Sequence, residues 1–507
     1  MFSTFLNCLR IPELRQRILL TLGLIFVVRV GTHIPMMGLD PHPLQNYFNY
    51  IAMTQGGGGG GVLGMVNMFT GGALLSGSIL TLGIMPYISA SIIMQIMCSV
   101  EPHMARLQQE GDVGRQKIAQ YTRYATIVIG LVQSLMMLQA LAAYPERIFP
   151  GFSIAQYGPI VIINHAWFIG VGMIVMTAGT ILLMWVGEQI TQYGIGNGVS
   201  LIITVNIMAS LPKAVTLTWT MLHPSIGVEG ALSLDAGQFI MMAVLLVVVI
   251  AGIVALTVGQ RKIPVQYAKR VVGRKVFQGQ TTYLPLKVNY SGVMPIIFAS
   301  AILLFPQQLF TYLYAWFNVS VFQEIEQALT RGSWWFYVAY GTLIFGFSFF
   351  WVSLMFKPIQ VADDLKKQGG YIPGVPPGEP TAKFLDFSMT RLTFAGAIFL
   401  MVIAVLPDVL TYLNHVPYQI SQFFGGTGTL IIVGVLLDTL SQVETFLLQR
   451  HYDGFLRKGR LKSRNITRAA QTLDREEIKN LRPLWVPLTL LFVAGLIAWV
   501  FNSQVGR

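Results

Sequence analysis

The segment GIMPYISAS at residues 83–91 recurs as GVMPIIFAS at residues 292–300, and six of the nine positions are identical. Both copies lie in long apolar runs, and a glycine followed by a proline interrupts the helix in each. A weaker pair of matches, SLII at 200–203 and TLII at 429–432, each follows a glycine-rich segment. Chance similarity between apolar runs is the alternative, above all for the second pair. The repeats predict two halves of opposite topology that face each other across a central interface.

Apolar runs recur along the whole chain of 507 residues, of which 54% are hydrophobic and only 11% charged. A typical soluble domain is about a quarter charged, and a run of about 20 apolar residues spans a bilayer. We expect ten spans, at 18–34, 76–97, 118–142, 167–186, 197–211, 239–258, 288–312, 334–356, 392–413 and 427–448. Each should be helical, because unpaired backbone amides are costly in lipid. The fold class is an all-α polytopic membrane protein with two inverted five-helix halves.

The halves and the tail give the predicted domains. The N-terminal half covers 1–215, the C-terminal half 216–450, and a basic tail 451–483. A further apolar run at 484–501 predicts an eleventh span, although Pro487 and its short length also suit a helix on the membrane surface or against a partner.

Basic residues concentrate in alternate loops, beginning with the N-terminal segment. The intervening loops carry only Arg147, Lys213 and Arg331, whereas the loop 260–287 and the tail are rich in lysine and arginine. This asymmetry places the N-terminus and the basic loops in the cytoplasm. The net charge of +12 is therefore expected to be a cytoplasmic feature.

Segment 66–79 begins with a stretch that is apolar but too short to cross the bilayer before the second span begins. Irregular backbone at membrane depth survives only inside protein or beside water. We therefore expect a re-entrant or buried segment, with an ordinary surface loop as the alternative. The poly-glycine run 56–61 before it should act as a flexible external tether.

Two function classes, an enzyme and a solute transporter, find little support. The sequence has no metalloprotease, serine-hydrolase or phosphate-loop motif, and Cys8 and Cys98 fit no metal-ligand spacing, so we expect no enzyme, cofactor or metal. A secondary transporter with inverted repeats is the main alternative. It normally requires buried ionisable groups, and the candidates are few: Arg29, Glu188 and Asp438.

Several motifs together resemble the SecY/Sec61-alpha family of protein translocase channel subunits. They are NMFTGGAL at 67–74, LGIMPYISAS at 82–91, GEQIT at 187–191 with GIGNG at 194–198, LPLKVN at 284–289 and TRLT at 390–393. The resemblance implies two five-helix halves around an hourglass pore that conducts unfolded secretory polypeptides across the bacterial inner membrane. It also implies a lateral gate between spans two and seven, through which signal sequences and membrane helices reach lipid.

The resemblance assigns residues to three parts of the channel. The pore ring comprises aliphatic residues: Ile84, Ile88, Val199, Ile203, Ile297 and Ile431. The plug comprises residues of the re-entrant segment: Asn67, Met68, Phe69, Thr70, Gly71, Gly72, Ala73 and Leu74. The lateral gate comprises residues of spans two and seven: Pro86, Ser89, Asn289 and Pro295. Asn289 has two interpretations, a hydrogen bond across the gate or a satisfied interfacial amide.

The basic loops resemble the family's cytoplasmic docking sites, and clustered cations suit ribosomal RNA phosphates. The candidate docking residues are Arg261, Lys262, Lys269, Arg270, Arg274, Lys275, Lys366 and Lys367. For any single cation, a plain positive-inside signal is the better explanation. Implied partners are SecE- and SecG-like small membrane subunits, a SecA-like motor ATPase, the ribosome and the lipid bilayer. Pro376 stands where relatives usually have an arginine, which puts that motor contact in doubt.

Overall fold

The computed structural model describes residues 12–54, 67, 69–149, 152–222, 236–267, 270–272, 275–277, 281–330, 332–414, 418–421, 423 and 426–459. The tether at 56–61, most of the basic tail and the apolar run at 484–501 lie outside these residues. So do Val66, Met68, Lys269 and Arg274.

Eight helices among the described residues are long and apolar enough to cross a bilayer, and they correspond to the third to tenth expected spans. They are α7 (Asp112–Ala143), α10 (His165–Tyr193), α11 (Gly198–Leu222), α12 (Ala236–Val258), α13 (Met294–Phe317), α15 (Trp334–Met355), α17 (Glu379–Asn414) and α19 (Thr427–Gly459). The first expected span corresponds to α2 (Pro12–Gly31) and the second to the shorter α5 (Met85–Val100). The fold is therefore that of a polytopic helical membrane protein.

The expected start of the second span is wrong, because residues 76–84 form turns and α5 begins only at Met85. Gly77 and Gly83 have positive φ values of 55° and 60°, which do not occur within an α-helix. The turns bond to the end of α2 and the residues just after it: the Ile79 amide donates to the Ile34 carbonyl at 3.0 Å, and the Ser78 hydroxyl donates to the Gly31 carbonyl at 3.2 Å. Irregular backbone persists here because neighbouring protein supplies its hydrogen bonds.

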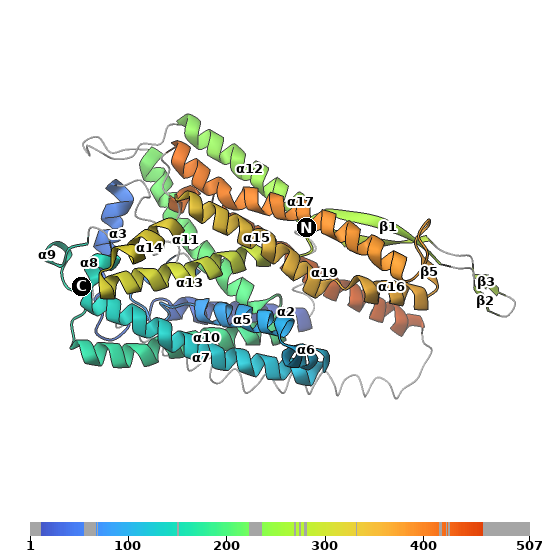
Figure 1. Ribbon diagram of the computed structural model, residues 1–507, viewed down its shortest axis with the longest axis horizontal. Coiled ribbons are helices and arrows are strands. Elements are labelled where there is room, and N and C mark those ends of the chain that lie inside the picture. The colour runs from blue at the N-terminus through green and yellow to red at the C-terminus, as the bar shows by residue number, and fades with distance from the viewer. Residues whose placement is uncertain are drawn as a thin grey trace.

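The long helices form two groups in which neighbours along the sequence pack together (Figure 1). α5, α7 and α10 pack on one another in the first part of the chain, and α15 packs against both α13 and α17 in the second. α5 and α7 both contact α13, while α19 packs against α11 and α12. The starts of α5, α11, α13 and α19 therefore meet near the centre of the bundle.

Strands occur in the basic loops, which the sequence analysis did not anticipate. β1 (Gln260–Tyr267) pairs antiparallel with β4 (Thr281–Lys287) and with the short β5 (Gly370–Tyr371), in the order β4-β1-β5. β2 (Arg270–Val272) and β3 (Lys275–Phe277) pair beyond them, and Figure 1 shows this hairpin projecting at one end of the molecule, past α16 (Pro358–Lys367). Ile263, Val265 and Leu286 are buried against side chains of α15 and α17. Because successive side chains of a strand point to opposite faces, this burial fixes which face of the sheet packs on the helices.

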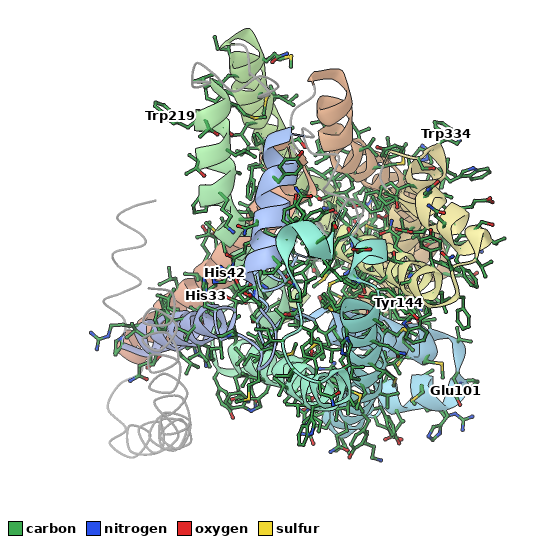
Figure 2. All side chains as sticks on the ribbon, turned by 90° about the vertical axis from the view of Figure 1, so that its left-hand side faces the viewer. His33, His42, Glu101, Tyr144, Trp219 and Trp334 are labelled. Atoms are coloured by element: carbon green, nitrogen blue, oxygen red, sulfur yellow. The ribbon has the colours of Figure 1, made fainter. Side chains whose placement is uncertain are left out.

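The opposite end carries short helices and aromatic residues. α3 (His42–Thr54), α8 (Pro145–Ile148), α9 (Ile154–Tyr157) and α14 (Ser320–Leu329) lie there (Figure 1). Tyr47 of α3 lies edge-on to Phe149 and Phe152, and burial raises the pKa of Tyr47 to about 12, so its hydroxyl stays protonated at physiological pH. In Figure 2, Trp219 and Trp334 point outward at the edge of the bundle, as interfacial tryptophans do.

Candidate functional site

The six expected pore-ring residues lie in one apolar cluster at the centre of the molecule. Five of them are at most 3% exposed, and Val199 is partly buried and packs against the others. Each lies at or near the start of a helix: Ile84 immediately before α5 and Ile88 within it, Val199 and Ile203 in α11, Ile297 in α13, and Ile431 in α19. The first turns of four helices thus bring the ring residues together.

The re-entrant segment packs directly on this cluster. Phe69 and Ala73 are 4% and 0% exposed and belong to the same apolar cluster as the ring residues. Leu74 is also buried but belongs to a neighbouring cluster with Leu44 and Phe149. The described part of the segment is therefore buried, which rules out the surface-loop alternative.

Local hydrogen bonds give the re-entrant segment its compact shape. The Gly72 amide donates to the Asn67 carbonyl at 2.9 Å, and the Leu75 amide donates to Asn67 Oδ1 at 3.3 Å. The Thr70 hydroxyl donates to the same Asn67 carbonyl at 3.2 Å. Gly71 and Gly72 have φ values of 69° and 90°, a conformation that L side chains rarely adopt.

Two polar side chains from different helices hold the re-entrant segment in place. Arg29 Nη1 of α2 donates to the Gly71 carbonyl at 3.2 Å, and Asn206 Nδ2 of α11 donates to the Phe69 carbonyl at 2.9 Å. Asn206 is 1% exposed, and its Oδ1 has no hydrogen-bond partner among the described residues. We call these two hydrogen bonds the latch. The motif comparison did not identify Asn206, although Arg29 stood out as a charge within an apolar run.

The two Gly-x-Met-Pro motifs have nearly the same backbone. Gly83 and Gly292 have φ values of 60° and 63°, and the following residues have φ, ψ of −91°, 2° and −92°, −7°. Pro86 and Pro295 then occupy the first turns of α5 and α13, where the missing amide costs nothing. The sequence repeat is therefore a structural repeat.

The other candidate gate residues flank this repeat. Ser89 is half-buried in α5, which packs against α13. Asn289 is 6% exposed; its Nδ2 donates to the Gly292 carbonyl at 2.9 Å, and its Oδ1 accepts from the Ser291 hydroxyl at 3.0 Å. These bonds stabilise the turn before α13. The geometry therefore favours the interpretation of Asn289 as a satisfied amide over that of a hydrogen bond across the gate. The expected start of the seventh span at residue 288 is wrong, since α13 begins at Met294.

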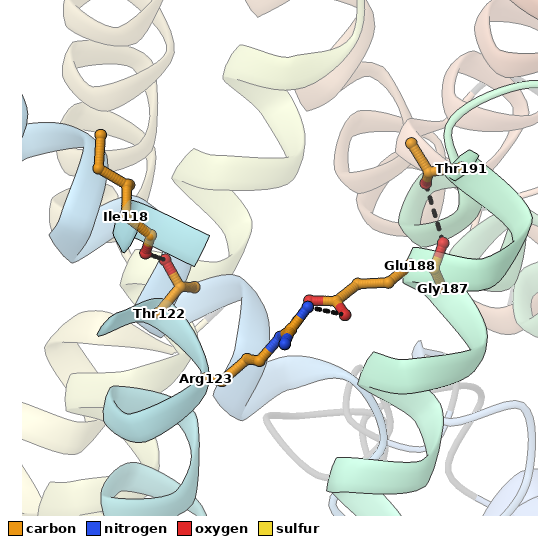
Figure 3. A network of polar contacts seen from close by, with 6 residues as sticks. All are labelled: Ile118, Thr122, Arg123, Gly187, Glu188 and Thr191. Carbon is orange, nitrogen blue, oxygen red and sulfur yellow. Dashed lines mark hydrogen bonds and ion pairs between the residues drawn. The ribbon is translucent and has the colours of Figure 1, made fainter. Parts of the chain in front are cut away.

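An ion pair joins α7 and α10 within the first group of helices (Figure 3). Arg123 Nε and Nη2 donate to Glu188 Oε1 and Oε2 at 3.0 and 2.8 Å, which is a bidentate arrangement. Glu188 therefore has a structural partner and is not an isolated acid of the kind a proton-coupled transporter requires. In the same turn, Thr191 Oγ1 donates to the Gly187 carbonyl at 2.9 Å and accepts from the Gly198 amide at the start of α11.

The candidate docking residues that the structure describes lie at the end of the molecule that carries the sheet. Arg261 and Lys262 are exposed on β1, and Lys366 and Lys367 are exposed at the end of α16. Arg270 and Lys275 lie in β2 and β3. The pairing of β1 with β5 joins the two basic loops into one unit, whereas the sequence alone gave no reason to join them. Among the described residues, no cluster of three or more His, Cys, Asp or Glu side chains is placed to hold a metal ion.

These features define a multi-pass helical membrane protein with an apolar centre covered by a buried re-entrant segment. That architecture suits a transmembrane channel.

Comparisons with known proteins identify the family. A SecY family profile matches residues 78–440. The protein translocase subunit SecY of Chlamydia trachomatis is 39% identical, over 91% of this chain and 100% of its own length. That of Streptomyces galbus is 41% identical, over 90% of this chain and 100% of its own. The chain belongs to the SecY family, and it is a protein-conducting translocation channel, not an enzyme.

Solved structures show the same fold at lower sequence identity. A structure described as that of a protein-conducting channel is 17% identical, with a TM-score of 0.52 over 80% of this chain and 90% of that one. Sec61 in a canine ribosome-channel complex from the endoplasmic reticulum is 16% identical, with a TM-score of 0.54 over 85% of this chain and 91% of that one.

Proposed function

We propose that the structure is the resting state of the channel, closed by the plug segment against the pore ring. The observation that supports this proposal is that Phe69 and Ala73 belong to the same buried cluster as Ile84, Ile88 and Ile297. An aliphatic ring has no fixed hydrogen bonds or charges with which to hold a passing polypeptide. When empty, such a neck excludes water and ions.

We further propose that the N-terminal half (1–215) and the C-terminal half (216–450) separate between α5 and α13 to form the lateral gate. The Gly-x-Met-Pro turns support this, because both helices begin with backbone that is not tied into a helical ladder. Pro86, Ser89 and Pro295 lie on this boundary, and Asn289 shapes the turn that leads into it. Signal sequences and membrane helices would leave into lipid here.

The basic end of the molecule is proposed to face the cytoplasm of the bacterium, with the channel in the inner membrane and the N-terminus inside. The clustering of exposed Arg261, Lys262, Lys366 and Lys367 around one sheet supports this. The related Sec61 is described in a ribosome-channel complex, and we propose the ribosome as a partner for this surface. A SecA-like motor and SecE- and SecG-like subunits are proposed from the family resemblance.

The pore assignment can be tested by crosslinking in a chain whose two native cysteines are replaced (Cys8→Ser, Cys98→Ser). A cysteine at Ile88, which is 3% exposed, should crosslink to a secretory chain arrested during translocation. The control is a cysteine at Ile93 of the same helix, which is 51% exposed and expected to face lipid or a partner. Crosslinks at Ile93 but not at Ile88 would show that the polypeptide does not pass the ring.

A further inference from the structure

The plug segment consists of two parts that contact different regions of the channel. We call Asn67, Phe69 and Thr70 the tip, and residues 73–78 the stem. Phe69 is 4% exposed and lies in the apolar cluster of the pore ring. Leu74 of the stem is 2% exposed and lies in a different cluster, together with Leu44 and Tyr47 of α3. The tip and most of the stem are therefore buried against different neighbours.

Hydrogen bonds attach the stem to α3 and to the segment that precedes it. The Met36 amide donates to the Gly77 carbonyl at 2.8 Å. Gln45 Nε2 of α3 donates to the Leu75 carbonyl at 3.4 Å, and the Ser78 hydroxyl adds its bond to the end of α2. The stem thus has hydrogen-bond partners outside the plug segment along most of its length.

The residues that hold the stem are themselves fixed to the first group of helices. We call residues 34–45 and 160–162 the outer collar. The Asp40 amide donates to the Ile160 carbonyl at 2.9 Å, and the Ile162 amide donates to the Gly38 carbonyl at 3.0 Å. All but two of the buried members of the apolar cluster around Leu74 belong to the N-terminal half. The outer collar is therefore packed as part of that half.

The tip has fewer attachments than the stem. Among the described residues, it makes one hydrogen bond outside the plug segment, from Asn206 Nδ2 to the Phe69 carbonyl. Phe69 also supplies most of the apolar contact with the pore ring, because Ala73 offers only a methyl group. Moving the tip therefore disturbs fewer contacts than detaching the stem from the outer collar.

Gly71 and Gly72 separate the tip from the stem. Both have positive φ, and a Cβ at Gly72 would meet nothing within 4 Å, so the backbone is not closely packed there. Glycine also reaches backbone conformations that other residues rarely adopt. Rotation at this pair breaks the latch and the bonds of Asn67 to the Gly72 and Leu75 amides. It leaves the bonds between the stem and the outer collar intact.

We propose that the stem stays on the outer collar when the channel opens, and that only the tip swings away from the pore ring, about Gly71 and Gly72. Leu44 and Gln45 of α3 are then positioning residues, because they hold the fixed end of the plug segment. The tip returns to the ring readily, since its pivot never leaves the channel. This inference rests on the proposed closing role of the plug segment.

Two positions of similar burial report on the two parts. In the chain with Cys8→Ser and Cys98→Ser, a single cysteine replaces Phe69 or Leu74. The channel and its accompanying membrane subunits are placed in nanodiscs, with or without an arrested secretory chain, so that a small maleimide reaches both faces. We expect the arrested chain to speed the reaction of Phe69→Cys by about tenfold or more, since labelling of a buried thiol follows local opening. The reaction of Leu74→Cys should change by less than about twofold.

The outcomes separate this inference from the proposed function. Equal acceleration of Phe69→Cys and Leu74→Cys would mean that the plug segment leaves as a whole, which overturns the fixed stem but keeps the closing role. No acceleration at Phe69→Cys would mean that the segment does not leave the ring, which overturns both. Thr70→Cys, at a position 1% exposed, repeats the tip measurement with the Phe69 ring in place.

Weakening the outer collar should free the stem. Leu44→Ala with Gln45→Ala removes an apolar contact and a hydrogen bond from the stem. With these substitutions, an arrested chain should speed the reaction of Leu74→Cys by about tenfold. The matched control is Asn46→Ala, at an exposed position of the same helix, which should leave Leu74→Cys protected. Equal rates for the double variant and the control would overturn the positioning role of Leu44 and Gln45.

Discussion

Arg29 reaches from α2 to donate a hydrogen bond to the main-chain carbonyl of Gly71, at 3.2 Å. A charged side chain is costly within a membrane span and usually has a functional reason to be there. Here the reason is a charge-assisted hydrogen bond to the segment that we propose closes the channel at rest and is released when it opens. Hydrogen bonds to charged groups contribute about 1.5–3 kcal/mol, enough to bias such an equilibrium without making it irreversible.

Replacing Arg29 with glutamine should loosen the plug segment. If the bond contributes about 1.5 kcal/mol to the closed state, its loss lowers the ratio of closed to open channels roughly tenfold. The resting ion conductance of the reconstituted channel should rise accordingly. Arg15→Gln is the matched control, because Arg15 lies on the same helix but is exposed. A resting conductance for Arg29→Gln equal to that of the control would remove Arg29 from the latch.

Alanine substitutions at Gly71 and Gly72 can distinguish the effect of backbone strain from the effect of disturbing the latch. Both have positive φ, so alanine at either position costs roughly 1–2 kcal/mol in backbone conformation. A Cβ at Gly71 would lie 2.5 Å from Arg29 Nη1 and 2.8 Å from Asn206 Oδ1, whereas a Cβ at Gly72 would meet nothing within 4 Å. We therefore expect Gly71→Ala to increase the resting leak more than Gly72→Ala. Equal leaks would mean that strain alone explains the effect.

Asn206 should contribute to the same latch from α11. Asn206→Leu leaves the buried Phe69 carbonyl without its donor, which costs about 1–3 kcal/mol. The double variant with Arg29→Gln should leak less than the sum of the two single effects predicts, because either loss alone already frees the segment. The measurement is resting conductance in a double-mutant cycle. Strict additivity would show that the two hydrogen bonds hold independent parts of the chain.

The apolar runs predicted eight long helices well, because a helix in lipid must satisfy its own backbone. The same reasoning failed at residues 76–84, where hydropathy cannot distinguish a helix from irregular backbone whose amides bond within local turns and to Ile34 just after α2. The ring residues came from family resemblance, since nothing in an isoleucine's local sequence tells a pore from ordinary packing. Asn206 went unnoticed because its partner, Phe69, lies 137 residues away.

The sheet formed by the basic loops (β4-β1-β5) was missed for a different reason. Ile263 and Val265 alternate with exposed neighbours in β1, which is a strand signal, but the charges in this loop suggested only orientation and docking. The pairing of β1 with β5 depends on contacts between loops about 100 residues apart. Such long-range pairing is not readable from local alternation.

The Arg123–Glu188 pair should contribute modestly to stability. Its bidentate geometry is favourable, but the Arg123 side chain is 48% exposed, so we expect no more than about 1 kcal/mol. Glu188→Gln should lower the thermal unfolding midpoint in detergent slightly, and exchanging the two residues (Arg123→Glu with Glu188→Arg) should restore part of the loss. Asp112→Asn, in a pair 3.9 Å apart and almost fully exposed, should have no measurable effect. Equal shifts for Glu188→Gln and Asp112→Asn would mean that the bidentate pair adds nothing.

The joining of the two basic loops can be tested with a disulfide between β1 and β5. Gln266 and Tyr371 are register partners, and the Tyr371 hydroxyl donates to Gln266 Oε1 at 3.1 Å. Antiparallel partners have Cα atoms about 4.5–5.5 Å apart, within the range of about 4.4–6.8 Å that a disulfide spans. In the chain without native cysteines, Gln266→Cys with Tyr371→Cys should therefore crosslink on mild oxidation, as read by mass spectrometry of the digested protein.

The control for this disulfide is Gln260→Cys with Tyr371→Cys, because Gln260 lies six residues along β1, roughly 20 Å away. It should not crosslink, and a similar yield in both variants would indicate that the loops are not held in register.

The oxidised Gln266–Tyr371 channel should also bind ribosomes as tightly as the reduced one, because Arg261, Lys262, Lys366 and Lys367 keep their positions around a sheet that is already formed. Weaker binding after oxidation would mean that docking requires β1 and β5 to separate, and that the docked arrangement of the basic residues differs from the one described.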